Sequence, residues 1–417
     1  MLQSDIIIIG AGASGLMAAY GAASRGCEVT VLEKMPRPGR KIVITGKGRC
    51  NFTNVKEWND FQSHIYPKAA FLRPAFQNLT PVQLIGFFED HGLASTVERG
   101  DRAFPESHRS MDVVDALVRA AEGAGAKIIC NCSVTNTIEG NGEWRFIVNC
   151  ADGSSWRCRK LIITTGGLSY PRTGSTGDGY PWAENFGLKL TPRFPSLTAI
   201  RPRDYRYSGT ISLKNVGIRL VIDGNPAQDE FGDLDFTDGG IEGPIGFKLS
   251  RKCVKAQING SKVSVVIDLK PAVSDIDLER RVQSLWKEIC NDRRSEGKPY
   301  RTKFAVLLGK LLPMDIVTQF MASFPDLDHN RLPRALKHWK LDIVGHVGYE
   351  RCVITAGGVS LDEINQKTLE TKKVPGLYLA GEILDLDADT GGYNLHIAFS
   401  TGYLAGISAA RQNPKIS

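Results

Sequence analysis

The hydrophobic pattern changes three times within the first 33 residues. An apolar run at residues 6–9 meets a glycine-rich turn at residues 10–15. Small and apolar residues follow at 16–23, and a second, β-branched run occupies residues 29–32. Such runs suit strands of a parallel sheet buried on both faces, and the small residues between them suit a closely packed helix. The pattern therefore predicts a strand–turn–helix–strand unit.

Each part of this unit has a role at a dinucleotide site. Gly10 permits the tight turn, Gly12 lets a pyrophosphate approach the backbone, and Gly15 lets the helix pack close to the strand. The free N–H groups and positive dipole end of the helix would face the phosphates. Glu33 ends the second strand about 20 residues further on, where a carboxylate accepts hydrogen bonds from ribose hydroxyls and disfavours the 2′-phosphate of NADP. We therefore predict dinucleotide binding, because a purely structural turn would not need the terminal acid.

The next segment, residues 34–54, is basic, rich in glycine and irregular. Its Arg and Lys side chains could pair with phosphates, and backbone N–H groups near Gly46 and Gly48 could hold an anion. The alternative is a solvated surface loop, which we disfavour because the segment directly follows the ribose acid. Cys50 has basic neighbours that favour a thiolate, but the interpretation preferred here is a buried, inert cysteine beside the cofactor.

Helices and strands then alternate up to about residue 190. Residues 80–92 have the period of an amphipathic helix, and Ser110 is placed as the N-cap of another helix through residue 121. The strands expected in this part lie at residues 127–134, 144–150, 156–159 and 161–165. The last strand ends in Thr165, Gly166 and Gly167, which indicates that its carboxyl end meets a ligand.

Residues 191–345 break this alternation. Strand-like runs at 207–213, 217–222 and 262–269 precede helix-like segments at 277–290, 302–312 and 314–324. We therefore predict an α/β fold: a three-layer, Rossmann-like dinucleotide-binding domain of residues 1–190 and 346–417, interrupted by an inserted β-rich domain with a small helical part, residues 191–345. Arg201, Arg203 and Arg206 interleave with tyrosines in the insert. A solvated loop is the favoured interpretation of that segment, and a second nucleotide or an acidic substrate is the alternative.

The C-terminal part returns to the first pattern. A short strand runs into Gly381-Glu382, and three aspartates follow at positions 385, 387 and 389. They lack the Gly and Glu spacing of a calcium-binding EF-hand loop, so no metal site is predicted. Gly391 and Gly392 then begin the last helix. Directed at a flavin ring, the dipole of this helix would stabilise the negative charge that develops there on reduction.

Composition narrows the class of protein. A chain of 417 residues exceeds one ordinary core, so two or three domains are expected. A net charge of +7 is mild and does not by itself indicate nucleic acid. Nine cysteines without a C-x-x-C motif indicate a reduced protein with neither a zinc knuckle nor a redox disulfide. The N-terminal run is too short for a signal peptide, and no stretch approaches the ~20 apolar residues of a membrane span. We expect a cytoplasmic protein without a membrane partner.

Three blocks of residues carry a resemblance to a known family. They are residues 10–15 with Glu33-Lys34, residues 46–54, and residues 376–382 through 390–394. Nearly the whole chain resembles the bacterial flavoproteins labelled NAD(P)/FAD-dependent oxidoreductases, of the aminoacetone-oxidase and bile-acid-reductase type. It is more distantly similar to the glutathione-reductase-like FAD superfamily. The first block is shared by many FAD and NAD proteins, whereas the other two are specific.

The resemblance implies FAD, with the flavin lying between the two domains. The glycine turn would hold the pyrophosphate, Glu33 and Lys34 would meet the ribose, and Val134 would touch adenine through its backbone. Residues from 381 onward would reach the ribityl chain and the isoalloxazine. The full set of implied cofactor contacts is Gly10, Gly12, Ala13, Ser14, Gly15, Glu33, Lys34, Arg40, Lys41, Gly48, Arg49, Cys50, Asn51, Val134, Thr165, Gly166, Gly167, Gly381, Glu382, Gly392, Asn394 and Leu395.

The function implied is an FAD-dependent oxidoreductase that transfers hydride through flavin N5, to or from a small organic substrate with an activated C=C bond or an amine. No second G-x-G-x-x-G motif is present, so NAD(P)H is a candidate donor that would dock transiently. The alternative is a flavin-containing binding or RNA-associated protein without its own turnover. That alternative needs a basic stripe, and the segment from Arg201 to Arg206 is too short, so no nucleic-acid partner is expected.

No catalytic acid or base stands out in the sequence. The candidates are Arg102, Tyr170, Asp238 and Tyr393, and for Arg102 an ordinary surface contact is the favoured interpretation. Asp238 marks a departure, because family members often have Phe-Thr-His where this chain has Phe236-Thr237-Asp238. If that histidine takes part in substrate chemistry in other family members, this chain is expected to act on a different substrate. The sequence does not indicate an oligomeric state.

Overall fold

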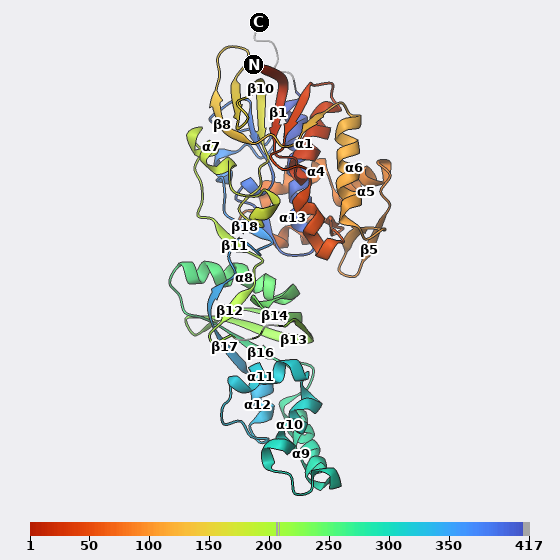
Figure 1. Cartoon of the computed structure of the whole chain (residues 1–417), viewed down its shortest axis with the longest axis vertical. Helices are drawn as coiled ribbons and strands as arrows, with labels where there is room; N and C mark the ends of the chain where they lie inside the picture. The colour runs from red at the N-terminus through yellow and green to blue at the C-terminus, as the bar shows by residue number, and fades with distance from the viewer. Residues whose placement is uncertain (206, 208, 412–417) are drawn as a thin grey trace. The chain divides into compact units, whose positions relative to one another are not determined.

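The computed structural model describes residues 1–205, 207 and 209–411, so that Arg206 lies outside the described residues. The chain divides into two compact units (Figure 1). The first comprises Met1–Pro195 and the chain from Cys352 onward, and the second comprises Ser196–Arg351.

A seven-stranded mixed sheet forms the centre of the first unit. Strands β7 (Lys127–Ile129), β2 (Val29–Leu32), β1 (Leu2–Ile9) and β10 (Ser155–Ile163) are parallel neighbours in that order. On its other side β10 has two partners: its first half pairs antiparallel with β9 (Phe146–Cys150), and its second half pairs parallel with β19 (Leu377–Leu379). Strand β8 (Val134–Glu139) extends the antiparallel edge.

Two helices of the first unit approach each other at backbone distance. Helix α1 (Ala13–Ala23) packs against α13 (Tyr393–Ala409), which is drawn in blue beside it in Figure 1. A Cβ added at Gly402 would lie 2.1 Å from the Ser14 carbonyl oxygen, and one at Gly406 would lie 2.2 Å from that of Ala18. Only glycine therefore fits at both positions of α13. Helix α6 (Ser110–Gly123) also packs on α1.

Shorter elements complete the first unit and include three small sheets, β3–β6–β5, β4–β20 and β11–β18. Their bounds are α2 (Arg40–Ile44), η1 (Thr45–Gly48), β3 (Thr53–Asn54), α3 (Trp58–Phe61), η2 (Gln62–His64), β4 (Ile65–Tyr66), η3 (Ala69–Leu72), α4 (Arg73–Asn78), α5 (Pro81–Asp90), β5 (Ser95–Glu98), β6 (Arg102–Pro105), η4 (Pro171–Thr173), α7 (Gly179–Asn185), β11 (Phe194–Ser196), β18 (Ile354–Ala356), η6 (Leu361–Glu363), η7 (Gly381–Ile383) and β20 (Asp387–Ala388).

The second unit is built on a closed six-stranded antiparallel barrel. Around the barrel its strands are β12 (Ile200–Pro202), β15 (Gly240–Glu242), β14 (Asn225–Thr237), β13 (Ile211–Ile222), β16 (Val263–Asp268) and β17 (Trp339–His346). The closure is made by short pairings, since β15 pairs with β14 only at residues 235–237 and with β12 only between Ile241 and Ile200. Inside, the rings of Phe236 and Trp339 stack with centroids 5.4 Å apart, and both side chains are fully buried.

Helices surround this barrel. Helix α8 (Gly243–Ile258) packs on β14. The helical part between β16 and β17 consists of α9 (Asp275–Asn291), η5 (Arg293–Ser295), α10 (Tyr300–Leu311), α11 (Met314–Ala322) and α12 (Leu332–Lys337). Among the described residues no single helix is both long and apolar enough to cross a membrane. Helices α10 and α11, bent by 118° at their junction, meet that test only as a pair.

The predicted fold class is confirmed, but several elements differ from the prediction. Strand β10 is one strand, where two were predicted. Its first half alternates in burial beside β9, while its second half is fully buried between two strands, so that the pattern changes within one element. Ser110 does not cap α6, whose N-cap is Arg109; instead its hydroxyl donates to the Val43 carbonyl. The long strand β14 and helix α8 were not predicted.

Candidate cofactor site

The glycine turn between β1 and α1 has the geometry that its sequence predicts. Gly10 has a φ of +99°, which only glycine adopts readily. A Cβ added at Gly15 would overlap the Gly10 carbonyl oxygen at 1.8 Å, so the helix packs directly on the turn. At Gly12, the N-cap of α1, an added Cβ would meet nothing within 4 Å. The turn therefore leaves open space at the one position where a pyrophosphate would approach the backbone.

Glu33 secures the turn from the end of β2. Its carboxylate accepts hydrogen bonds from the backbone N–H groups of Ala11 (2.7 Å) and Met35 (2.8 Å). Burial raises the pKa of this carboxyl group, and the two N–H donors oppose that shift. The neighbouring Lys34 amine lies 2.5 Å from the Asp178 carboxylate and donates to the Thr176 hydroxyl. The acid is thus also part of the turn's own structure, and the lysine is held in an ion pair.

A second cluster forms around the Glu382 carboxylate. The Lys41 amine lies 2.5 Å from Oε2, the Ser169 hydroxyl donates to Oε1, and the backbone N–H of Thr355 donates to Oε1 at 2.9 Å. These groups come from α2, the loop after β10, and β18. Ser169 and Thr355 were not predicted, because nothing in their local sequence marks them as partners of a residue more than 25 positions away.

Glycines line the carboxyl ends of β10 and β19. A Cβ at Gly381 (φ +79°) would lie 2.5 Å from the Ser14 hydroxyl, which brings the end of β19 onto α1. A Cβ at Gly167 would lie 2.5 Å from the Thr355 hydroxyl, and one at Gly166 would lie 2.8 Å from that of Ser175. The carboxyl end of β19 therefore lies against α1, and the glycines after β10 pack against Ser175 and Thr355 at the same edge of the sheet. This is the edge of a doubly wound sheet at which ligands bind.

The basic segment is a strained loop. Lys47 and Cys50 both have positive φ (56° and 57°), an unusual conformation for residues with side chains, which is commonest at functional sites. Burial raises the pKa of the Cys50 thiol to about 12, so this cysteine is not a thiolate at neutral pH. The Arg49 guanidinium pairs with Glu98 and lies 4.4 Å over the Phe104 ring.

The start of α13 closes against this loop. Gly392 is its N-cap, with φ +97°, and a Cβ there would lie 2.5 Å from the Thr53 carbonyl oxygen and 2.8 Å from Asn51 Oδ1. The Asn394 side chain clamps β20 through two hydrogen bonds of 2.8 Å with the backbone of Ala388. Three other predicted contacts take less part in this cluster: Arg40 is exposed, Leu395 packs on the core, and Val134 is buried in its pairing with Cys150.

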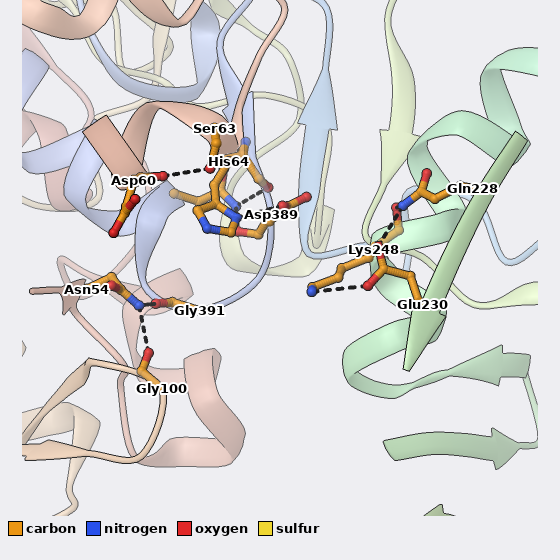
Figure 2. Close-up of polar contacts among 12 residues, drawn as sticks. Asn54, Asp60, Ser63, His64, Gly100, Gln228, Glu230, Lys248, Asp389 and Gly391 are labelled. Atoms are coloured by element: carbon orange, nitrogen blue, oxygen red, sulfur yellow. Dashed lines mark hydrogen bonds and ion pairs between the residues drawn. The ribbon is translucent and has the colours of Figure 1, made fainter. Parts of the chain in front are cut away.

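A histidine–aspartate pair lies beside the start of α13 and was not predicted. His64 Nδ1 is 2.9 Å from Asp389 Oδ2, as Figure 2 shows, and the Asp389 backbone N–H donates to the His64 carbonyl oxygen at 2.9 Å. The imidazole stacks on the Tyr393 ring with centroids 4.4 Å apart. Burial and the Asp389 charge raise the pKa of that tyrosine. The pairing of β4 with β20 holds both members of the His64–Asp389 pair in place.

The other candidates for catalysis do not join this group. Arg102 Nε donates to the Arg99 carbonyl oxygen at 3.0 Å, and Tyr170 is the N-cap of η4 with a φ of +52°. Asp238 belongs to the second unit, where Arg351 pairs with it at 2.9 Å and lowers the pKa of its carboxyl group.

Two buried polar atoms of the predicted contacts bear on whether a cofactor fits. Asn51 Oδ1 and Thr165 Oγ1 are among the buried side-chain atoms that have no hydrogen-bond partner within residues 1–205, 207 and 209–411, and others lie elsewhere in the chain. Buried polar atoms without partners are rare in native proteins, and each calls for an explanation such as a bound group. Both residues were predicted to contact FAD, and the space beside Gly12 is open as well. The residues present therefore fit a bound dinucleotide.

His396, on α13, is a buried neutral histidine that the sequence did not single out. Its ring lies 5.1 Å from that of Phe61 and 5.3 Å from that of Phe76, and Nδ1 is 2.9 Å from the Thr53 hydroxyl. Burial lowers the pKa of this imidazole to about 3. The histidine is therefore a core residue that helps to hold α13 against β3.

We expect this histidine to make the fold acid-sensitive. An unfolded chain protonates histidine at a pKa of about 6.5, so below that pH the unfolded state binds the extra proton. Stability should fall as the pH drops from about 6.5 towards 3, by about 1.4 kcal/mol per pH unit from this group. Urea unfolding at pH 7 and pH 5 would measure the difference, and His396→Phe should remove this contribution. An unchanged slope in His396→Phe, with exposed His338→Phe as the control, would contradict the assignment.

Together, the fold and the site define a Rossmann-type flavoprotein with an inserted antiparallel barrel. The chain belongs to the family of HI0933-like proteins, whose Rossmann-domain model matches residues 4–408. The predicted family resemblance is thereby confirmed, and the chain is an FAD-dependent oxidoreductase.

Full-length relatives support this placement. The chain is 30% identical to a ribosomal RNA dihydrouridine synthase of Haemophilus influenzae, over 98% of this chain and 99% of the relative. It is also 30% identical to a 3-dehydro-bile acid delta(4,6)-reductase of Clostridium scindens, over 98% and 100% of the two chains. A ribosomal RNA dihydrouridine synthase of Escherichia coli is 29% identical over 97% of both chains.

Solved structures share the fold. A 3-ketosteroid-delta4-(5alpha)-dehydrogenase of Rhodococcus jostii superposes with a TM-score of 0.51 at 14% identity, covering 99% of this chain and 97% of that one. A 3-ketosteroid delta1-dehydrogenase of Sterolibacterium denitrificans has a TM-score of 0.52 at 13% identity, covering 98% and 100%. At such identities the likeness concerns the fold alone.

Proposed function

We propose that this protein is a reductase that saturates a C=C bond conjugated to a carbonyl group. The observation that carries the proposal is a shared chemistry in the names of its full-length relatives. Dihydrouridine is uridine whose ring C=C bond, conjugated to a carbonyl, has been saturated. A 3-dehydro-bile acid with delta(4,6) double bonds is likewise a conjugated ketone. Oxidation of an amine, the other class considered from the sequence, has no comparable support.

The cofactor contacts predicted from the sequence belong to this proposal. When bound, FAD supplies a hydride at N5 and regains it from a donor such as NAD(P)H. Gly12 and the N-terminus of α1 would hold the pyrophosphate, Glu33 the ribose, and Asn51 and Thr165 would use their buried oxygen atoms for polar contacts.

His64 supplies the proton that the reaction needs. Saturating the C=C bond adds a hydride to one carbon and a proton to the other, so NAD(P)H and one proton are consumed for each bond. The Asp389 carboxylate only accepts hydrogen bonds, so the His64 Nδ1 atom carries the hydrogen between them. That fixes the orientation of the ring and leaves Nε2 to hold and deliver a proton.

An anaerobic titration tests the proposed function. FAD-loaded protein is titrated with NADH and then NADPH while the flavin absorbance is followed, and 2-cyclohexenone is added to the reduced protein. We expect one nucleotide to bleach the flavin and the enone to restore its colour. Failure of both nucleotides to bleach the flavin, with bleaching by aminoacetone, would instead make the protein an amine-oxidising enzyme.

The molecule that bears the C=C bond is a separate question. A small enone and the uracil ring of an RNA present the same reacting group. The sequence favoured a small molecule and no nucleic acid, but two of the full-length relatives are named for ribosomal RNA. RNA is therefore a second candidate class of substrate for this chain.

A further inference from the structure

We propose that the exposed basic residues within 280–310, called here the basic surface, form a docking site for RNA. This inference rests on the proposed function and would make a uracil ring in a structured RNA the substrate. It is carried by the charge, exposure and ring contacts of this chain's own residues.

The basic surface carries a local excess of positive charge. Residues 280–310 contain nine Lys and Arg and three Asp and Glu, and three further acids, Asp275, Asp277 and Glu279, lie in the first turns of α9. The nine are Arg280, Arg281, Lys287, Arg293, Arg294, Lys298, Arg301, Lys303 and Lys310. This concentration was not predicted from the sequence, because its residues are spread over two helices and their connection and do not form one short basic segment like that near Arg201.

The fold turns these cations towards solvent. Helix α9 buries Leu278, Val282 and Ile289, which its 3.6-residue period places on one face. Arg280 and Lys287, seven residues apart, lie on the opposite face, and both are exposed. All nine cations are exposed except Lys303, which is half-buried. Helix α10 packs on α9, and the connection between them brings the three cations at positions 293, 294 and 298 to the same end of the helical part.

Most of these cations lack an acidic partner. Arg280, Arg294 and Lys310 pair with Asp277, Asp292 and Glu288 at 3.6, 2.8 and 2.9 Å. No ion pair involves the other six within the part of the chain that the structure describes. On the barrel of the same unit, by contrast, Lys214 pairs with Asp233 at 2.7 Å and Arg219 pairs with Asp229 at 2.6 Å. Unpaired exposed cations are the groups that neutralise backbone phosphates.

Aromatic rings accompany the cations. The Trp286 ring stacks on His329 with centroids 4.5 Å apart and lies 5.0 Å from the ring of Tyr300. Tyr300 is 44% exposed and is the first residue of α10, next to Arg301. Unpaired bases of single-stranded RNA stack on such rings while cations hold the phosphates. Single-stranded RNA offers phosphates for the cations and unpaired bases for the rings, so it matches both features of this surface.

A binding measurement with matched charge reversals tests this proposal. The probe is protein-free ribosomal RNA, titrated with the full-length FAD-loaded protein at 50–200 mM KCl. One variant combines Arg293→Glu, Lys298→Glu and Arg301→Glu on the basic surface. The control combines Lys252→Glu, Lys255→Glu and Lys262→Glu, which are exposed in the same unit and reverse the same number of charges.

We expect the basic-surface variant to bind RNA about 30-fold more weakly and to lose about 2 from the slope of log K against log salt, as three lost phosphate contacts imply. The control should bind within about threefold of wild type, and both variants should reduce 2-cyclohexenone at the wild-type rate. Equal weakening in both variants, or displacement of the RNA by polyglutamate at equal affinity, would overturn the docking site. If wild-type protein bound RNA but did not reduce 2-cyclohexenone, the proposed function would be refuted and the docking site would stand.

Discussion

Replacing Gly12 with valine is expected to weaken FAD binding by at least about 100-fold while leaving the protein folded. The glycine is the N-cap of α1 and has φ −81° and ψ −168°, an extended conformation that valine adopts without strain. A Cβ there meets nothing within 4 Å in the protein, so the new side chain would project into open space. That space is where the proposed pyrophosphate approaches the backbone N–H groups.

The magnitude follows from the lost hydrogen bonds. Two hydrogen bonds from N–H groups to a charged oxygen contribute about 1.5–3 kcal/mol each, so displacing the pyrophosphate should weaken FAD by at least about 100-fold. Poorer capping of the helix by valine would cost about 1 kcal/mol of stability. Titration of the FAD-free protein with FAD, followed by flavin fluorescence, measures the affinity, and thermal unfolding without FAD checks the fold.

Gly15→Ala is the informative comparison for this prediction. Its Cβ would lie 1.8 Å from the Gly10 carbonyl oxygen, so this smaller change should destabilise the turn itself. We expect a lower unfolding temperature without FAD for Gly15→Ala and a nearly unchanged one for Gly12→Val. If Gly12→Val retained FAD at wild-type affinity, the pyrophosphate would not lie at this turn.

Replacing His64 with glutamine is expected to slow reduction of the enone by about 100- to 10,000-fold, the usual range for loss of a general acid. Glutamine can still hydrogen-bond to Asp389, so the segment after β20 that carries Asp389 should stay in place. An amide cannot deliver a proton, however. Flavin content and the rate of bleaching by NAD(P)H should not change, because neither step uses the proton held by His64. Stopped-flow absorbance separates the two half-reactions.

Two further variants test whether the effect is specific to proton delivery by His64. Asp389→Asn should slow the same step by a smaller factor, because Asp389 positions the imidazole and does not itself deliver the proton. His338→Gln removes an exposed histidine elsewhere and should leave both half-reactions unchanged. A solvent deuterium isotope effect on enone reduction should be present in wild type. Equal rates in wild type and His64→Gln would assign the proton donor to another group, such as Tyr393.

The fold was predictable where apolar residues recur at the spacing of a helix or a strand. The run at residues 6–9 and the period of residues 80–92 correspond to β1 and α5, and Thr80 caps α5 in a full capping box. Strand β14 was missed because ten of its thirteen residues are exposed or half-buried, so its buried positions do not alternate along the whole strand. Strand β10 was divided in two because its burial is set by two different neighbouring strands.

The site was predictable only in part. The glycine positions follow from the sequence because backbone geometry and close approach leave no other residue type at Gly10 and Gly15. The contacts of Glu382 could not be predicted from the sequence, because its partners Lys41, Ser169 and Thr355 come from three separate segments. The His64–Asp389 pair joins residues more than 300 positions apart, and no spacing rule connects them.

The sequence by itself determined the dinucleotide turn, the class of fold and the family resemblance, because these rest on local backbone conformation and on short-range periodicity. The tertiary structure alone decided which polar side chains meet. The pairing of β4 with β20 sets His64 against Asp389, and the packing of α9 on α10 brings together two helices that each carry exposed cations. The physical reason is that side-chain contacts depend on how distant segments pack, whereas turns and periods depend on neighbours in the chain.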